Sequence, residues 1–182
     1  MTVAALYVDE RGPYVSMSGV DAWTERRDAR LYAGPHPVVA HPPCADWSRL
    51  KGMAKHVPGR RELAPLAVWQ VRACGGVLEH PAWSSLWRTL DLPRPGELAD
   101  AWGGWSIEVD QVAWGHKATK ATWLYLVGVD RARVVPRTGG QATHVVTTNK
   151  KGDRLRKLGS RDASRTPSEF AAWLVGLARQ AT

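Results

Sequence analysis

Three short segments of the chain hold residue types that carry chemistry. His41-Pro42-Pro43-Cys44 presents a thiol after two prolines, Glu79-His80 pairs a carboxyl group with an imidazole, and Lys117 and Lys120 lie in the stretch that begins at Gln111. A cysteine thiolate is a nucleophile, and a carboxyl group is a general acid or base. The combination predicts covalent chemistry in which Cys44 attacks, Glu79 and His80 handle protons, and the lysines hold an anionic group.

Each of these segments adjoins a predicted strand. The short apolar runs Val3–Val8, Pro37–Ala40 and Gly76–Glu79 end in polar or Pro-rich residues, and Trp123–Gly128 is the clearest strand pattern in the chain. Between the second and third runs, apolar residues at a period near 3.6 predict a helix over Leu63–Cys74. Strand, helix, strand is the unit of a parallel sheet, and the carboxyl ends of such strands meet at one edge. We therefore expect Cys44 and Glu79 to lie close together.

The remaining pattern completes an α/β domain. Residues 91–105 are rich in Pro and Gly and predict a loop, while 106–110 and 144–147 predict two further strands. A final helix is predicted from the capping-box spacing of Thr166 and Glu169, with Pro167 at its first position. No repeat or linker divides the chain. The prediction is one compact α/β domain over residues 1–182, a Rossmann-like open sheet with flanking helices.

Composition excludes several classes of protein. With 182 residues and 44% hydrophobic content, the chain can bury a sizeable core and is not disordered. No run approaches 18 apolar residues and the N-terminus does not resemble a leader, which predicts a cytoplasmic protein without a membrane partner. The two cysteines, Cys44 and Cys74, form no CxxC pair. Both are predicted to be reduced thiols, with Cys74 in the core and no metal bound.

Charge is concentrated in the last third of the chain. The net charge is +8; residues 1–130 carry equal numbers of acidic and basic side chains, whereas residues 131–182 hold 11 basic and 3 acidic ones. Seven of the basic residues fall in 149–165, which we predict to be a mobile surface loop. Such a segment favours a polyanion partner, and we expect DNA. The predicted phosphate contacts in this loop are Lys150, Lys151, Arg154, Arg156 and Lys157.

In their order along the chain these motifs resemble those of the DNA cytosine-5 methyltransferases. The similarity rests on Pro43-Cys44 after a strand, Glu79 at the end of a later strand, and the run 114–120 leading into the strand 124–128, and it covers roughly residues 37–128. The resemblance implies that Cys44 attacks C6 of a cytosine flipped out of the helix and that Glu79 holds the ring at N3 and the exocyclic group. It implies that Lys117 and Lys120 replace the family's basic motif.

The resemblance also implies S-adenosylmethionine as cofactor, with Asp9, after the first strand, as the candidate contact. Residues 1–36 do not contain the family's Phe-x-Gly-x-Gly pattern, and His80 stands where the family has Asn. The chain has no room for a separate target-recognition domain. This small size favours a bacteriophage or mobile-element origin.

Two other functions fit the same residues. A non-catalytic nucleic-acid-binding protein would keep the scaffold and use only the basic residues. An enzyme with the same thiol chemistry would use another one-carbon donor or act on free nucleotides. Each site residue also has a structural alternative: Cys44 as a packed small side chain, Glu79 as half of a surface ion pair, His80 and His41 as hydrogen-bonded histidines, and Asp9 as a turn cap.

Overall fold

The structure, a computed structural model, describes residues 1–146 and 155–181. Its centre is a six-stranded sheet in the order β2-β1-β3-β4-β6-β5. Strands β1 to β4 pair in parallel, and β6 runs antiparallel to both β4 and β5. The fold is therefore mixed α/β, as predicted at that level. The strands are β1 (Val3–Leu6), β2 (Val20–Trp23), β3 (Val38–Ala40), β4 (Gly76–Pro81), β5 (Trp105–Asp110) and β6 (Ala121–Val127).

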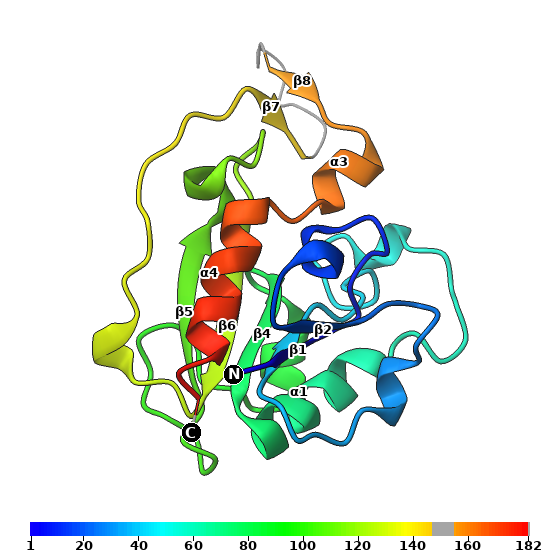
Figure 1. Cartoon of the computed structure of the whole chain (residues 1–182). Helices are drawn as coiled ribbons and strands as arrows, with labels where there is room; N and C mark the ends of the chain where they lie inside the picture. The colour runs from blue at the N-terminus through cyan, green and yellow to red at the C-terminus, as the bar shows by residue number, and fades with distance from the viewer. Residues whose placement is uncertain (147–154, 182) are drawn as a thin grey trace.

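Helices cover both faces of the sheet (Figure 1). On one face α1 (Leu63–Cys74) and α2 (Ser85–Thr89) pack against a core that includes Leu78. On the other, α4 (Ser168–Ala178) and the 3-10 helix η1 (Pro13–Ser16) pack against a core that includes Val77. Because successive residues of a strand alternate between faces, Glu79 lies on the α4 side and His80 on the α1 side. Among the described residues, no helix has the length and apolar character that a membrane crossing requires.

Shorter elements complete the fold outside the main sheet. Strands β7 and β8 form a separate two-stranded parallel sheet, next to the short helix α3. The bounds are β7 (His144–Val145), β8 (Arg156–Lys157), α3 (Ser160–Ser164) and the 3-10 helices η2 (Ala29–Leu31), η3 (Lys51–Met53), η4 (Gln111–Trp114) and η5 (Arg131–Arg133).

The predicted strand-helix-strand unit is confirmed as β3, α1 and β4, and α1 has the predicted bounds. The helix ends at a Gly75-Gly76 turn in which both residues have positive φ angles, +72° and +120°. A Cβ on Gly76 would lie 2.0 Å from the Val38 carbonyl oxygen. Glycine is therefore required for β4 to start directly beside β3.

Three local predictions differ from the structure in detail. The described part of the predicted basic loop, residues 155–165, contains β8, which pairs with β7, and α3, and Leu158 is buried despite the polar composition of the segment. Helix α4 does not begin with a Thr166 capping box: Pro167, in an extended conformation, is the cap residue, and no side chain caps the helix. The strand predicted over 144–147 is present as β7, which ends at Val145, and Thr147 lies outside the described residues.

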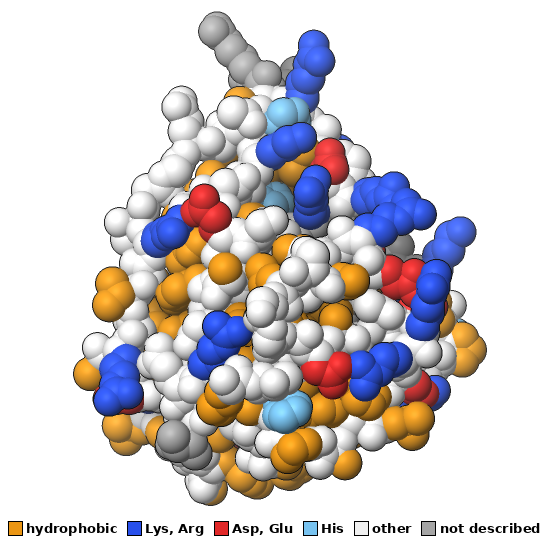
Figure 2. All heavy atoms as spheres, in the orientation of Figure 1, with side chains coloured by type: hydrophobic (Ala, Val, Ile, Leu, Met, Phe, Trp, Pro, Cys, Tyr) orange, Lys and Arg blue, Asp and Glu red, His pale blue; other side chains and the backbone are white. Residues whose placement is uncertain are grey.

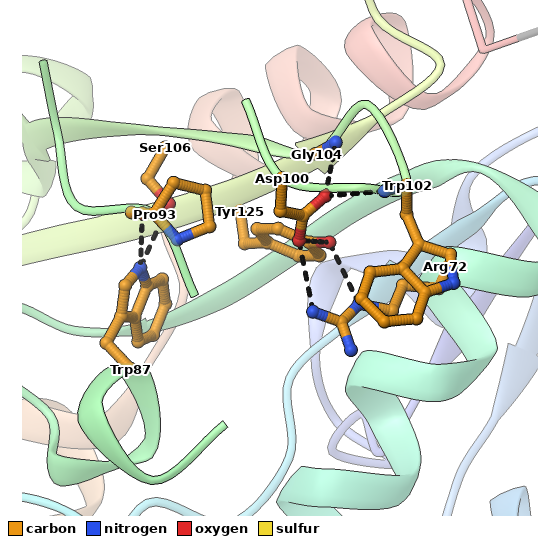
Figure 3. A network of polar contacts seen from close by, with 8 residues as sticks. All are labelled: Arg72, Trp87, Pro93, Asp100, Trp102, Gly104, Ser106 and Tyr125. Atoms are coloured by element: carbon orange, nitrogen blue, oxygen red, sulfur yellow. Dashed lines mark hydrogen bonds and ion pairs between the residues drawn. The ribbon is translucent and has the colours of Figure 1, made fainter. Parts of the chain in front are cut away.

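A polar network fixes the loop between α2 and β5 (Figure 3). The Asp100 carboxylate accepts hydrogen bonds from Arg72 Nη2 (3.0 Å), the Tyr125 hydroxyl (2.7 Å) and the backbone amides of Trp102 and Gly104. The Arg72 guanidinium also lies 3.6 Å from the centroid of the Trp102 ring. This otherwise irregular loop is thereby joined to α1 and β6.

Strand order locates a ligand-binding edge. The chain leaves β1 for β2 on one side and returns to β3 on the other side of β1, so the direction of winding reverses between β1 and β3. In open α/β sheets, ligands bind outside the carboxyl ends of the strands at such a switch point. The residues that follow β1, β3 and β4 meet at this edge.

Candidate active site

Cys44, Glu79 and Lys120 come together at this edge from three separate segments. Cys44 follows β3, Glu79 lies near the carboxyl end of β4, and Lys120 directly precedes β6, whose amino end pairs with the carboxyl end of β4. Glu79 is hydrogen-bonded to His41, three residues before Cys44, and through Gln111 to Thr122, two residues after Lys120. The segment that holds Cys44 and the segment that holds Lys120 therefore both meet Glu79.

The Glu79 carboxylate is buried and held at both oxygens. The residue is 8% exposed; Oε2 accepts a hydrogen bond from His41 Nδ1 at 2.9 Å, and Oε1 accepts one from Gln111 Nε2 at 2.9 Å. Burial by itself would raise the pKa of Glu79, but the hydrogen bond and charge of His41, together with the charge of Lys120, lower it to about 2. Glu79 is therefore an ionised carboxylate at neutral pH.

His41 links Glu79 to a buried tyrosine. Its Nε2 lies 2.7 Å from the Tyr14 hydroxyl, and the two rings are tilted at a centroid distance of 5.2 Å. When Nδ1 donates to Glu79 in the neutral ring, Nε2 is an acceptor, and so the Tyr14 hydroxyl donates to it. Tyr14 is 2% exposed; burial, reinforced by the charge of Glu79, raises its pKa well above 10.

Gln111 and Thr122 connect Glu79 to Lys120. Gln111 Nε2 also donates to Thr122 Oγ1 (3.0 Å), which in turn donates to the Lys120 carbonyl oxygen (3.0 Å). Gln111 is fully buried, and its Oε1 has no hydrogen-bond partner in the described part of the chain. An unpaired amide oxygen therefore lies on the same side chain that holds the Glu79 carboxylate.

Cys44 is a protonated thiol in this environment. Burial, with the neighbouring negative charge of Glu79 added to it, raises the pKa of Cys44, and the charge of Lys120 only partly opposes this. Both cysteines are free, as predicted, and Cys74, the last residue of α1, is partly buried against the core on that face of the sheet. A reaction at Cys44 therefore needs a base to remove the thiol proton.

His80 lies on the other face of the sheet from Glu79. It is 1% exposed, its Nδ1 lies 2.8 Å from Ser84 Oγ, and its ring faces Trp87 at a centroid distance of 6.4 Å. Burial lowers the pKa of His80 to about 4, so the ring is neutral at physiological pH. These contacts are those of a core histidine, and the predicted catalytic role of His80 gains no support from its position.

The predicted anion-binding residues occupy different places. Lys120 is at the edge described above, where its Nζ lies 3.5 Å from the Ser164 carbonyl oxygen. Lys117 is exposed and has its Nζ 4.0 Å from an Asp162 carboxylate oxygen on α3. Of the five residues predicted in the basic loop, Arg156 and Lys157 are exposed on β8, and Lys150, Lys151 and Arg154 lie outside the described residues.

The turn after β1 does not fit S-adenosylmethionine in this conformation. Asp9 is exposed, its Oδ1 accepts the Arg11 backbone amide (2.7 Å), and the Gly12 amide donates to the Asp9 carbonyl oxygen (2.9 Å). The turn thus satisfies its own amides rather than presenting them to a ligand. The buried Tyr14 side chain packs directly after this turn, against Val8.

Sequence reasoning missed part of this site. Tyr14 and Thr122 carry no motif that distinguishes them from structural residues, and Gln111 is marked in the sequence only as the start of a polar stretch. His41, in the segment that leads to Cys44, is the direct partner of Glu79. Nowhere in residues 1–146 and 155–181 do three or more His, Cys, Asp or Glu side chains gather as a metal site would require.

Comparison of the sequence with known proteins found no match: no model of a known protein family matches the chain, and no curated protein matches it.

Proposed function

We propose that the protein modifies a pyrimidine base in nucleic acid, with Cys44 as the nucleophile and Glu79 as the group that holds the base. The observation that supports this most is the convergence of Cys44, Glu79 and Lys120 at the switch-point edge from three segments distant in sequence. This arrangement agrees with a Rossmann-like open sheet, in which ligands bind at that edge. It also agrees with the resemblance to cytosine-5 methyltransferases.

The chemistry begins with addition of the thiol to the ring. The Cys44 proton passes to a base, sulfur forms a bond to C6, and the C5–C6 π electrons move to C5, which becomes nucleophilic. The Glu79 carboxylate is an acceptor for the exocyclic amino group of cytosine. A proton delivered through His41 to Glu79 would neutralise the charge that develops on N3. Solvent then protonates C5, one of the two hydrogens on C5 is removed by a base, and the electrons of that C–H bond re-form the C5–C6 double bond as sulfur leaves C6. The released thiolate regains a proton, so the cytosine and the Cys44 thiol are both restored.

This half-reaction has a signature that requires no cofactor. Hydrogen on C5 of cytosine should exchange with solvent deuterium in an oligonucleotide incubated with the protein, because the C5 carbanion equivalent is protonated from solvent before sulfur leaves. We expect Cys44→Ala to abolish exchange and Cys74→Ala, the matched control, to retain it. Exchange that survives in Cys44→Ala would contradict the assignment of the nucleophile.

DNA is the proposed partner, since it contains cytosine and the chain carries a net charge of +8. S-adenosylmethionine is the electrophile that the resemblance implies for C5. The turn at Asp9, whose amides are bonded within the turn, gives that proposal no support, and covalent trapping with and without S-adenosylmethionine tests it.

A second function is favoured by two observations. Both oxygens of Glu79 are occupied by protein donors, and the pKa of Cys44 is raised, as a structural site in a non-catalytic nucleic-acid-binding protein would show. In that case Cys44→Ala should bind DNA and remain functional, and no C5 exchange should occur with any variant.

A further inference from the structure

Trp83 is both strained and exposed. Its backbone has a φ of 64°, a conformation that bulky residues rarely adopt, and its side chain is 61% exposed. With 61% of the side chain exposed, the indole gains only part of the burial that could offset the cost of this backbone conformation. Strain that the surrounding structure maintains is characteristic of functional positions.

Backbone hydrogen bonds place Trp83 beside the candidate active site. Ala82 N donates to the Ala121 carbonyl oxygen (3.0 Å), next to Lys120, and Ser85 N donates to the Trp47 carbonyl oxygen (2.9 Å), three residues beyond Cys44. Trp83 thus follows β4 at the edge where Cys44 and Glu79 lie. It packs with the residues of the α1 face.

The Trp83 ring packs on the indole of Trp123, which packs in turn on the indole of Trp87. Its centroid is 5.0 Å from that of Trp123, which is 5.5 Å from that of Trp87. Trp123 Nε1 donates to Glu108 (2.6 Å), and Trp87 Nε1 donates to Ser106 Oγ (2.9 Å). Trp83 is therefore the outer, solvent-facing member of a rigid aromatic row.

A basic segment, residues 48–61, begins next to Trp47, whose carbonyl oxygen accepts the Ser85 amide two residues after Trp83. It contains five Arg or Lys residues and no acidic residue. Arg49, Lys51 and Lys55 are exposed and form no ion pair with any described residue, whereas Arg60 is paired with Asp46. The segment runs along the right-hand side of the view in Figure 1, and Lys and Arg side chains are prominent on that side in Figure 2.

The two ends of this basic segment are held together by Trp47 and Arg61. Trp47 is 2% exposed, its Nε1 donates to the Arg61 carbonyl oxygen (3.0 Å), and the Arg61 guanidinium lies 4.5 Å from its ring centroid. Residues 41–62, between β3 and α1, form a long connection whose one regular element is the short helix η3. Long connections of this kind are often functional.

We propose that Trp83 stacks on an unpaired base of single-stranded nucleic acid whose phosphates contact Arg49, Lys51 and Lys55. Aromatic platforms beside a basic track are how proteins hold single strands, because every base offers a π face and every nucleotide a phosphate. The stacked base is a neighbour of the pyrimidine that meets Cys44. The inference takes only the class of substrate from the proposed function.

The test compares the binding of two single strands of about 12 nucleotides, one intact and one carrying abasic sites, by fluorescence anisotropy. Trp83→Ala should weaken binding of the intact strand about 10-fold and leave binding of the abasic strand unchanged. Trp69→Ala is the matched control, since Trp69 is 50% exposed and packs on Trp102 at a centroid distance of 5.4 Å. It should bind both strands as the wild type does.

Trp83→Phe retains a ring and should keep most of the affinity, which separates stacking from misfolding. Equal affinity of Trp83→Ala and wild type for the intact strand would overturn the proposal, as would an equal loss on both strands. Absence of C5 exchange, with Trp83-dependent binding retained, would contradict the proposed function and leave this inference standing.

Discussion

Burial has opposite outcomes at the two central residues of the site. Both Cys44 and Glu79 are removed from water, which by itself raises the pKa of a thiol and of a carboxyl group. Glu79 nevertheless stays ionised because His41 donates to it. At Cys44 the charge of Lys120 and a backbone hydrogen bond only partly offset burial and the charge of Glu79, so the thiol stays protonated. The residue types are readable from sequence, but these protonation states depend on partners that only the fold supplies.

Replacing Glu79 with Gln tests the charge at this position. The amide keeps the shape of the carboxyl group but cannot accept a proton, so C5 exchange should fall by about 10²- to 10⁴-fold, the range of a lost general acid or base. Glu62→Gln, an exposed change at the start of α1, should leave exchange unaltered. Undiminished exchange in Glu79→Gln, measured by mass spectrometry of the oligonucleotide, would contradict the assigned role.

His80 should make stability depend on pH. Its pKa is about 4 in the folded protein against an ordinary 6.5, so the unfolded chain binds a proton first as the pH falls. Stability is therefore lost between pH 6.5 and 4, by about 2 kcal/mol on going from pH 7.5 to 5. Urea unfolding at the two pH values measures this, and His80→Gln should show a smaller change. An equal change in both proteins would be against a neutral, buried His80.

At the scale of elements, the Arg72–Asp100 pair holds the loop before β5 on α1. The Arg72 side chain is 5% exposed, so Arg72→Ala would leave the Asp100 charge buried without its partner, at a cost of about 3–5 kcal/mol. The double variant with Asp100→Ala should lose less than the sum of the single changes. Strict additivity in urea unfolding would show that the pair does not act as a unit.

The connection between β3 and α1 should contribute to the salt dependence of binding. With Arg49, Lys51 and Lys55 changed together to Ala, the slope of log affinity against log salt should fall by about 2 for a single strand, at about 0.7 for each phosphate contact. A variant in which Arg26, Arg88 and Arg94, which lie outside this segment, are changed together to Ala serves as the control. An unchanged slope in the first variant would show that this segment does not contact phosphates.

For the molecule as a whole, elements with strong local patterns could be predicted from the sequence. Burial is visible in the sequence as the apolar runs of β1, β3 and β4 and as the periodic apolar residues of α1. The order strand, helix, strand then predicts that β3 and β4 pair in parallel. Strand β2 was not predicted, because its residues VDAW are only partly buried and include Asp21. The pairing of β7 with β8 depends on long-range backbone hydrogen bonds that local polarity does not reveal.

The candidate site was predictable only in part, for a similar reason. Cys44 follows β3 and Glu79 lies near the carboxyl end of the neighbouring strand β4, so the topology of the sheet brings their segments together. Tyr14 reaches His41 from η1, and Gln111 reaches Glu79 from the turn after β5. These contacts follow from how the strand ends and turns pack in three dimensions, and no spacing in the sequence specifies them.

Covalent trapping tests the central claim most directly. A DNA strand bearing 5-fluorocytosine is incubated with wild type, Cys44→Ala and Cys74→Ala, with and without S-adenosylmethionine, and resolved on a denaturing gel. The account predicts an adduct with wild type and Cys74→Ala and none with Cys44→Ala. An adduct that appears only when S-adenosylmethionine is added would identify the cofactor. No adduct in either condition, or an adduct that persists in Cys44→Ala, would contradict Cys44 as the nucleophile.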